Sequence, residues 1–383
     1  MSDGSGTDMD VASLVGYLMP FDGREGLSHP ASIDEARQIL AGHPGLSCLV
    51  VAQRNERYRF EELLCSDKAC LDRSENVFDS IKALIKTHRI AVAGTRFIFH
   101  FKSDACEYQS QFAVLSNSRD VGNPRVVLWP LLMKKECLLT FTRYKPHLHH
   151  EITRYLKAPD SISWARKASV FFFRGMNSGN PFTSIQYPWN RFRRSRQDLL
   201  VEALRLPQDL QVLVDIGFNK LYPKRQILER QLAAPALLEE QFTGYLRDGC
   251  SISDLRYDIE LLLAQIKPSL SMQQMYGFRY IFCPEGFDCS SALPWVLASN
   301  SLAIVPPFHY ENVIVNSQAL KPYVHFVPIR EDFGDLPEVM RWVLAHDAEC
   351  QQIVRNANDY MRPFVDQQCM ITVQKAIIEK LVS

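Results

Sequence analysis

The sequence predicts an α/β protein with two domains. From about residue 90 onward, short β-rich runs alternate with helical patterns, which is typical of parallel sheets joined by crossover helices. Most of these runs lack a strict alternation of apolar and polar residues. Largely apolar runs of this kind are typical of strands covered on both faces. The length of 383 residues exceeds what one hydrophobic core usually organises, and it suffices for two.

The predicted strands leave room for helices between them. Their ranges are 96–101, 112–115, 126–129, 168–173, 211–216, 278–282, 302–305 and 325–329. Helix signals are clearest after the last strand, where Asp335 and Glu338 have the spacing of a capping box and apolar residues then recur at helical intervals. A second helix is predicted from about Asp347, and a third over residues 371–381.

The polar stretch 157–163, which contains Pro159, is the best candidate for a domain boundary. We therefore predict one domain over residues 1–158 and a second over residues 159–362. The last segment, 363–383, is expected to form a helix that packs back on the first domain.

The overall charge excludes some classes of partner. The chain carries 43 basic and 43 acidic residues, so its formal net charge is zero. Such a chain has no general attraction for nucleic acid or for an anionic bilayer, and any anion site must be local. No apolar run approaches the roughly 20 residues of a membrane-spanning helix, and residues 1–10 lack the basic flank and apolar core of a secretory signal. These features favour a cytoplasmic protein without a nucleic-acid partner.

The sequence predicts no metal site. Ten cysteines are scattered without a Cys-x-x-Cys pair, so we expect free thiols. His147, His149 and His150 lie close together, but histidines at i and i+2 share a metal only on an extended segment. No cysteine or carboxylate pattern accompanies them.

A turn that contains Gly286 follows the predicted strand 278–282. Ser290 and Ser291 then fall where a following helix would leave its first N–H groups unpaired, and such an end favours anions. We predict that a phosphate binds at this corner. The alternative is an ordinary strand-to-helix corner, because a single glycine is a weaker signal than a Gly-x-Gly-x-x-Gly fingerprint.

Residues just beyond the other strand ends are candidates too, because ligands of open α/β sheets bind beyond the carboxyl ends of strands. In the segment 117–120, Asp120 could accept a proton from an attacking hydroxyl, and the adjacent Arg119 would keep it ionised. The alternative is a surface arginine and aspartate in a turn.

Two further strand ends carry candidate ligand-binding groups. The strand 168–173 stops at Arg174 and Gly175, where backbone can approach a ligand, and the basic cluster 191–196 downstream could neutralise a diphosphate. The alternative for that cluster is a solvated helix face. Glu311 follows the strand 302–305 and is a candidate ribose acceptor, unless it is a solvated loop residue.

Ordered segments between about residues 110 and 365 resemble the motifs of glycosyltransferase family 90. This family includes protein O-glucosyltransferases, fungal capsule xylosyltransferases and bacterial lipopolysaccharide-modifying relatives. The twin prolines Pro306 and Pro307 and the segment 299–301 look closest to the bacterial branch. The matching segments are 164–167, 171–175, 278–280 with Gly286 and Ser290, 297–302, 320–328, and 335–336 with 356–357.

The resemblance implies a GT-B architecture, in which two Rossmann-like domains face each other across a cleft. The first domain would hold the acceptor and the second a nucleotide sugar. Members of the family invert the anomeric centre in one displacement that needs a base and no metal. By this resemblance Asp120 is the base, Arg174 and Gly175 lie near the nucleotide, and Arg196, with Arg194 as the alternative, contacts the diphosphate.

The chain departs from the family at one position. Eukaryotic relatives place an arginine where this sequence has Ala292, so neutralisation of the diphosphate would depend on Arg174, Arg196 and the helix start near Ser290 and Ser291. The departure leaves open a nucleotide-sugar-binding protein without turnover.

The resemblance therefore predicts an inverting, metal-independent glycosyltransferase. It would move a hexose or pentose from a nucleotide diphosphate to a hydroxyl of a glycan or lipopolysaccharide-type acceptor. The expected nucleotide is UDP. A lipid-linked acceptor would bring the protein to the inner face of the membrane as a peripheral protein. A sulfotransferase or phosphotransferase with a similar cleft is a further alternative.

Overall fold

The computed structural model divides the chain into two compact units. Unit 1 comprises residues 1–159, 308–320 and 358–383, and unit 2 comprises residues 160–307 and 321–357. The structure describes residues 10–19, 30, 32–42, 46–54, 57–63, 78–79, 81–92, 94–100, 114–116, 118–121, 126–128, 150–178, 195–221, 225–233, 260, 263–286 and 288–382. The division predicted from sequence kept residues 159–362 together, whereas residues 308–320 belong to unit 1. The final segment of unit 1 begins at residue 358, and the predicted start was residue 363.

The main sheet of unit 1 is mixed. Its strand order is β2-β1-β3-β4-β6, with β1 antiparallel to both β2 and β3, and with β3, β4 and β6 parallel. The hairpin of β1 and β2 was not predicted from sequence. The strands are β1 (Leu46–Arg54), β2 (Arg57–Leu63), β3 (Arg96–His100), β4 (Val114–Ser116) and β6 (Val126–Leu128).

A small core covers this sheet. Leu46, Ile98, Val114 and Val126 are buried together, one from each of four strands, and residues of helix α2 (Ile33–Gly42) pack against them. Burial of such apolar side chains contributes about 1.5–3 kcal/mol each relative to exposure. These contacts hold the parallel strands that lead into the polar segment around residue 119.

A second, two-stranded sheet of unit 1 joins segments that are distant in sequence. Strand β5 (Ser118–Asp120) pairs antiparallel with β11 (Tyr310–Asn312), and Arg119 lies opposite Glu311. Both segments, which were expected just beyond the ends of predicted strands, are therefore strands themselves.

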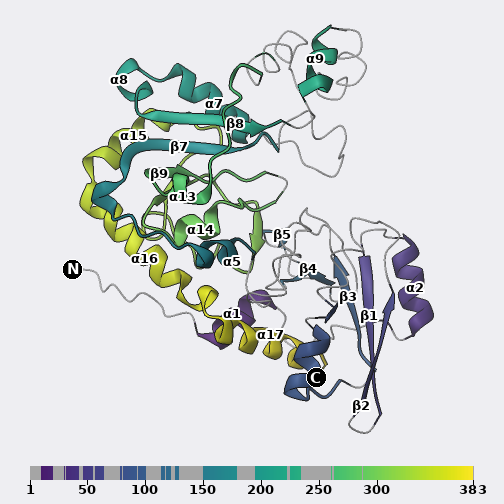
Figure 1. The fold of residues 1–383 in the computed structure, drawn as a ribbon. Coiled ribbons are helices and arrows are strands. Elements are labelled where there is room, and N and C mark those ends of the chain that lie inside the picture. The colour runs from purple at the N-terminus through teal and green to yellow at the C-terminus, as the bar shows by residue number, and fades with distance from the viewer. Residues whose placement is uncertain are drawn as a thin grey trace. The chain divides into compact units, whose positions relative to one another are not determined.

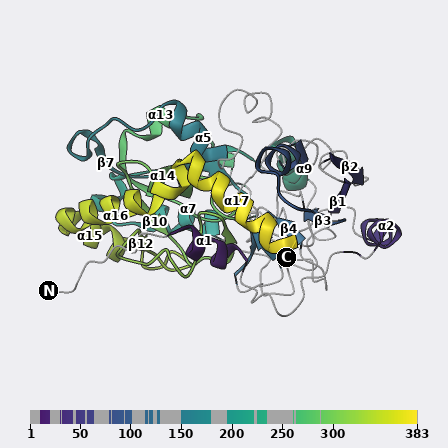
Figure 2. The same cartoon turned by 90° about the horizontal axis from the view of Figure 1, so that it is seen from below.

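Helices from both ends of the chain meet in unit 1. Helix α1 (Val11–Leu18) lies beside α17 (Gln367–Val382), as Figure 2 shows, and Lys380 donates to the carbonyl oxygen of Met19 at 3.4 Å. Unit 1 also contains α5 (His150–Lys157).

Unit 2 is built on a fully parallel sheet, which confirms the α/β class (Figure 1). Its strand order is β12-β10-β9-β7-β8. The strands β9 and β10 have the predicted bounds, whereas β8 begins later than predicted because residues 208–211 are helical. The strands are β7 (Ala168–Met176), β8 (Val214–Lys220), β9 (Phe278–Phe282), β10 (Leu302–Val305) and β12 (Val327–Pro328).

Helices connect and cover these strands. The described ones are η1 (Trp164–Arg166), α7 (Ser195–Arg205), α8 (Gln208–Gln211), α9 (Arg225–Ala233), α13 (Met272–Met275), α14 (Leu293–Leu297), α15 (Leu336–Ala345) and α16 (Asp347–Val365), of which α16 continues into unit 1. The predicted capping box at α15 was wrong: the Asp335 carboxylate accepts from the N–H of Arg330 and makes no cap hydrogen bond.

One hydrophobic core of unit 2 lies on one face of its sheet. Phe171 and Phe173 of β7, Phe218 of β8 and Phe282 of β9 are buried with residues of α7, α15 and α16. Because side chains alternate along a strand, Phe172 and Arg174 belong to the opposite face, where Phe172 stacks on Phe278 with ring centroids 4.2 Å apart.

Candidate functional site

The strand order of unit 2 reverses between β7 and β9. The chain runs from β7 outward to β8, and then returns to β9 on the other side of β7. In open α/β sheets the crevice at such a switch point, beyond the carboxyl ends of the strands, is where ligands bind. The residues that follow β7 and β9 are Asn177 and Ser178 on one side and the segment 283–286 on the other.

Arg196 connects these two strand ends. From the first turn of α7, its Nη1 donates to Ser178 Oγ at 2.6 Å and to the carbonyl oxygen of Met176 at 2.9 Å. Its Nε donates to the carbonyl oxygen of Glu285 at 2.9 Å, and its Nη2 donates to that of Pro284 at 3.2 Å. The guanidinium therefore fixes the loop after β9 against the end of β7.

Burial lowers the pKa of Arg196 to about 10, although the negative charges of Asp288 and Glu285 act in the opposite direction. Arg196 remains a cation at neutral pH, because that pKa lies well above 7. It therefore supplies a fixed positive charge at the switch point, which is the kind of group that a diphosphate would pair with.

Gly286 lies directly against this guanidinium. A Cβ atom at residue 286 would lie 2.8 Å from Arg196 Nη2 and 2.9 Å from its Cζ, and it would overlap Ser178 Oγ. Distances below 3.0 Å are not found for real Cβ atoms, so the arginine and a side chain at 286 cannot both keep these positions. The structure thus brings together Arg196 and Gly286, two of the residues predicted from sequence.

We expect Gly286→Ala to displace Arg196 and to destabilise the protein by about 1–3 kcal/mol, the usual cost of overpacking. The midpoint of thermal unfolding measures the stability loss. Gly334→Ala is the matched control, because its Cβ would meet only the Asp332 carboxylate oxygen at 3.3 Å and the Arg330 side chain at 3.6 Å. An unchanged unfolding midpoint in Gly286→Ala would show that the contact relaxes without cost.

Ser290 and Ser291 precede the next helix without capping it. Helix α14 begins at Leu293, its N-cap position is Ala292, and no side chain there makes a cap hydrogen bond. Ser290 is buried and its carbonyl oxygen accepts from the Leu293 N–H, whereas Ser291 is exposed. The helix has five residues and Pro294 at its second position, so one of its first N–H groups is missing.

Arg174 lies on the other face of the sheet. Its Nη2 contacts both carboxylate oxygens of Asp215, at 2.8 and 2.9 Å, and its Cζ lies 5.2 Å from the ring centroid of Phe172. The Cζ of Arg196 instead lies 6.0 Å from the ring centroid of Phe173. Adjacent positions of a strand face opposite sides, so the structure does not bring the two guanidinium groups together.

Lys267 is a second cation that pairs with Asp215, the partner of Arg174. Neither Lys267 nor Asp215 was among the residues predicted from sequence. Lys267 Nζ donates to Asp215 Oδ1 at 2.7 Å. Partial burial acts to raise the pKa of Asp215, but hydrogen bonds from Lys267 and Arg174 outweigh burial and hold the pKa below its usual value. Gly217 makes room for both cations, because a Cβ there would lie 2.8 Å from Arg174 Nη1 and 2.7 Å from Lys267 Cδ.

The remaining predicted glycine, Gly175, follows Arg174 in β7. A Cβ there would lie 3.0 Å from the Cζ of Phe173, so the backbone at residue 175 packs closely on that ring. The close packing accounts for glycine at this position without a ligand.

In unit 1, Asp120 is the last residue of β5, and its backbone pairs with Tyr310. The side chain of Asp120 lies outside what the structure describes, as do Asn117 and Arg194. Arg119, the expected cationic neighbour, directs its guanidinium to Glu311 instead, with Nε and Nη2 each 3.1 Å from Oε2.

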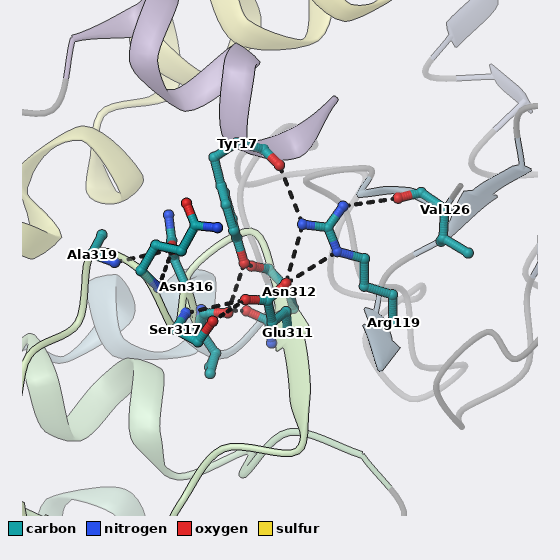
Figure 3. A network of polar contacts seen from close by, with 10 residues as sticks. Tyr17, Arg119, Val126, Glu311, Asn312, Asn316, Ser317 and Ala319 are labelled. Atoms are coloured by element: carbon teal, nitrogen blue, oxygen red, sulfur yellow. Dashed lines mark hydrogen bonds and ion pairs between the residues drawn. The ribbon is translucent and has the colours of Figure 1, made fainter. Parts of the chain in front are cut away.

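Glu311 is buried, contrary to the alternative of a solvated loop residue. Its side chain is 4% exposed and lies in β11. One carboxylate oxygen pairs with Arg119, and the other accepts hydrogen bonds from the hydroxyl and the backbone N–H of Ser317 (Figure 3). Both oxygens are therefore engaged within unit 1.

Within the described ranges, no group of three or more histidine, cysteine or carboxylate side chains is arranged to hold a metal ion. His147 and His149 lie outside those ranges. The described cysteines Cys48, Cys283, Cys289, Cys350 and Cys369 form no disulfide. None of the helices that the structure describes has the length and apolarity of a membrane span.

The comparison with protein families matches the C-terminal part of the chain. Residues 247–375 match the family model described as "Glycosyl transferase family 90". This segment includes Gly286, Ser290, Ser291 and Glu311.

Three relatives illustrate the similarity. The chain is 30% identical over 114 residues to "O-glucosyltransferase LpsA" of Dichelobacter nodosus, which covers 30% of this chain and 36% of the relative. It is 27% identical over 103 residues to "Protein O-glucosyltransferase 2" of Danio rerio, covering 27% and 20%. It is 24% identical over 208 residues to "Uncharacterized protein 027R" of Frog virus 3 (isolate Goorha), covering 52% and 19%. The matched parts thus span little more than a third of these relatives, or less.

Proposed function

We propose, from the premise that this chain belongs to glycosyltransferase family 90, that it transfers a sugar from a nucleotide diphosphate to a hydroxyl group of a glycan acceptor. The observation that carries the proposal is the contact between Arg196 and Gly286 at the switch point of unit 2. The absence of a side chain at residue 286 lets the Arg196 guanidinium lie against this turn, and its charge would neutralise part of the charge of a diphosphate bound beyond the strand ends.

The proposed reaction is a single displacement with inversion. The acceptor oxygen forms a bond to the anomeric carbon of the sugar, and the bond from that carbon to the diphosphate oxygen breaks. The electron pair leaves with the diphosphate, and the hydroxyl proton passes to Asp120. Positive groups near the leaving diphosphate, chiefly Arg196, stabilise its negative charge. A metal ion has this role in other transferases.

The finer assignments belong to the same proposal. UDP is the proposed nucleotide, and a lipopolysaccharide-type glycan is the proposed acceptor, because the motifs look closest to the bacterial branch and one relative is named O-glucosyltransferase LpsA. We further propose a GT-B arrangement and a cytoplasmic protein that meets a lipid-linked acceptor at the membrane surface.

The test is release of UDP from UDP-glucose and UDP-xylose, with water or a lipopolysaccharide core fragment as acceptor. We expect one donor to be turned over, and we expect EDTA to leave the rate unchanged. Loss of activity with EDTA and its recovery with Mg²⁺ or Mn²⁺ would contradict the metal-independent mechanism. Saturation by adenosine nucleotides in place of UDP would favour a sulfotransferase or phosphotransferase.

Ala292 favours one alternative, a nucleotide-sugar-binding protein without turnover. This N-cap position of α14 carries no cation, so the leaving diphosphate has one positive partner fewer than in eukaryotic relatives. Binding raises the unfolding temperature: a ligand at about 100 times its dissociation constant adds about 2.7 kcal/mol. Stabilisation by UDP-sugars without any release of UDP would support this alternative.

A further inference from the structure

The buried ion pair of Arg119 and Glu311 lies at the centre of a polar network in unit 1 (Figure 3). Beyond the two contacts to Glu311, Arg119 Nη1 donates to the carbonyl oxygen of Val126 at 3.1 Å and Nη2 to that of Tyr17 at 3.3 Å. The guanidinium also lies over the Tyr17 ring, 5.3 Å from its centroid. One side chain thus connects β5 to β6, to α1 and to β11.

Tyr17 holds the segment after β11 from the other side. Its hydroxyl lies 2.9 Å from the carbonyl oxygen of Val315 and 3.2 Å from that of Asn312. The Asn312 side-chain oxygen accepts from the N–H groups of Ile314 and Val315 at 2.8 and 2.7 Å. The turn that carries Glu311 is therefore closed by hydrogen bonds from within and tied to α1.

Stability alone is a weak reason for such a pair. The side chains of Arg119 and Glu311 are 5% and 4% exposed, so both charges have lost their water. The desolvation penalty of a buried pair largely cancels its attraction, and apolar side chains of similar volume often stabilise a fold equally well. The best-attested use of a buried polar pair is to specify one register among several.

The two-stranded sheet of β5 and β11 needs an interaction that fixes its register, the alignment of the two strands. β5 and β11 have three residues each, and a two-stranded sheet of that size has little stability of its own. A slip by one residue would turn every side chain of a strand to the other face. Because Arg119 and Glu311 are directly opposite each other, their pairing is possible in the observed register and is lost after such a slip.

We infer that the Arg119–Glu311 pair, supported by Tyr17, acts as a register lock that positions Asp120. The inference rests on the proposed function, in which Asp120 is the base. Arg119 and Glu311 are then positioning residues that act through Asp120, and Glu311 is not a ribose acceptor. The inference assigns Arg119 to a structural contact with a residue 192 positions later in the sequence.

The test replaces the pair by apolar residues in the doubly substituted variant Arg119→Met with Glu311→Leu. This change avoids an isolated buried charge, so we expect the unfolding temperature to change little. The turnover number for UDP-glucose should fall by about 10- to 100-fold, the scale of a misplacement of about 1 Å, while KM stays within about twofold. A merely structural pair would leave the turnover number as it is. The matched control, Arg37→Met with Asp34→Leu, replaces an exposed pair of unit 1 and should change neither quantity.

Combination with Asp120→Asn decides whether the pair acts through the base. If it does, the apolar pair should cause no further loss in the Asp120→Asn background, because coupled residues are not additive. Losses that multiply would overturn the inference, as would full turnover in the apolar-pair variant. If that variant does not fold, Tyr17→Phe replaces it: loss of the hydroxyl bonds should lower turnover with KM unchanged, and unchanged turnover would overturn the inference.

The outcomes also separate this inference from the proposed function. An inactive wild-type protein, or full activity in Asp120→Asn, overturns both. An active wild-type protein with an inactive Asp120→Asn variant and a fully active apolar-pair variant overturns the register lock alone.

Discussion

Asp120→Asn is expected to lower turnover by about two orders of magnitude or more, the usual contribution of a positioned general base. Asparagine has nearly the shape of aspartate but cannot take up the proton of the acceptor hydroxyl. Since the proposed donor site is built from residues of unit 2, we expect the affinity for UDP to stay nearly unchanged. Steady-state release of UDP measures the first quantity, and calorimetric titration with UDP the second.

Asp34→Asn is the matched control for this prediction. Asp34 lies in the first turn of α2 in unit 1, its side chain is 84% exposed, and its ion pair with Arg37 is a surface pair. Such pairs contribute little, so turnover and stability should both stay at the wild-type level. Full turnover in Asp120→Asn would remove this residue from the mechanism and leave the base unassigned.

The elements of unit 2 were the easiest to predict, because burial dictates their composition. β10 is a continuous apolar run and β9 is an apolar and aromatic run that contains one charged residue, Arg279. The predicted bounds of both strands agree with the structure. β8 was predicted to begin too early. Residues 208–211 form a short helix with Leu210 buried, and a four-residue helix beside an apolar run has no periodicity that distinguishes it from strand.

The site was only partly predictable for a different reason. Gly286 stands out in sequence as a turn glycine, and the structure adds the cause: a side chain there would meet Arg196 and Ser178. In contrast, the sequence suggested for Glu311 a ribose acceptor or, as the alternative, a solvated loop residue, because its partner Arg119 lies 192 residues earlier. Pairing across that separation leaves no local pattern, and the same holds for Arg174 with Asp215 and Lys267.

The largest expected effect on stability comes from Lys167. Its ammonium group is fully buried and pairs with Asp160 at 2.7 Å, donates to Ser301 Oγ at 3.0 Å, and also donates to the carbonyl oxygen of Tyr276. These partners lie where β7, β9 and β10 begin, at the end of the sheet opposite the switch point. The pair therefore belongs to the scaffold of unit 2.

We expect Lys167→Met to lower the free energy of unfolding by about 3–5 kcal/mol, the typical cost of leaving one charge of a buried pair uncompensated. Urea-induced unfolding measures the change. Arg330→Met is the control, since Arg330 and Asp332 form an exposed pair with 63% and 58% of their side chains accessible, and its effect should stay within about 0.5 kcal/mol. If Lys167→Met lowers the free energy of unfolding by no more than about 0.5 kcal/mol, water must reach the Asp160 carboxylate in that variant.

The pH dependence of unfolding separates the charge of Lys167 from its packing. Burial lowers the pKa of Lys167 below the usual 10.5, although Asp160 opposes the shift. In the alkaline window between the lowered pKa and 10.5, the unfolded state binds more protons than the folded state, so this group makes the free energy of unfolding rise with pH. The wild-type protein should show that contribution and Lys167→Met should lack it, so the difference between the two should grow as the pH approaches 10.5. A difference that stays constant over the window would show that Lys167 titrates normally in the folded protein.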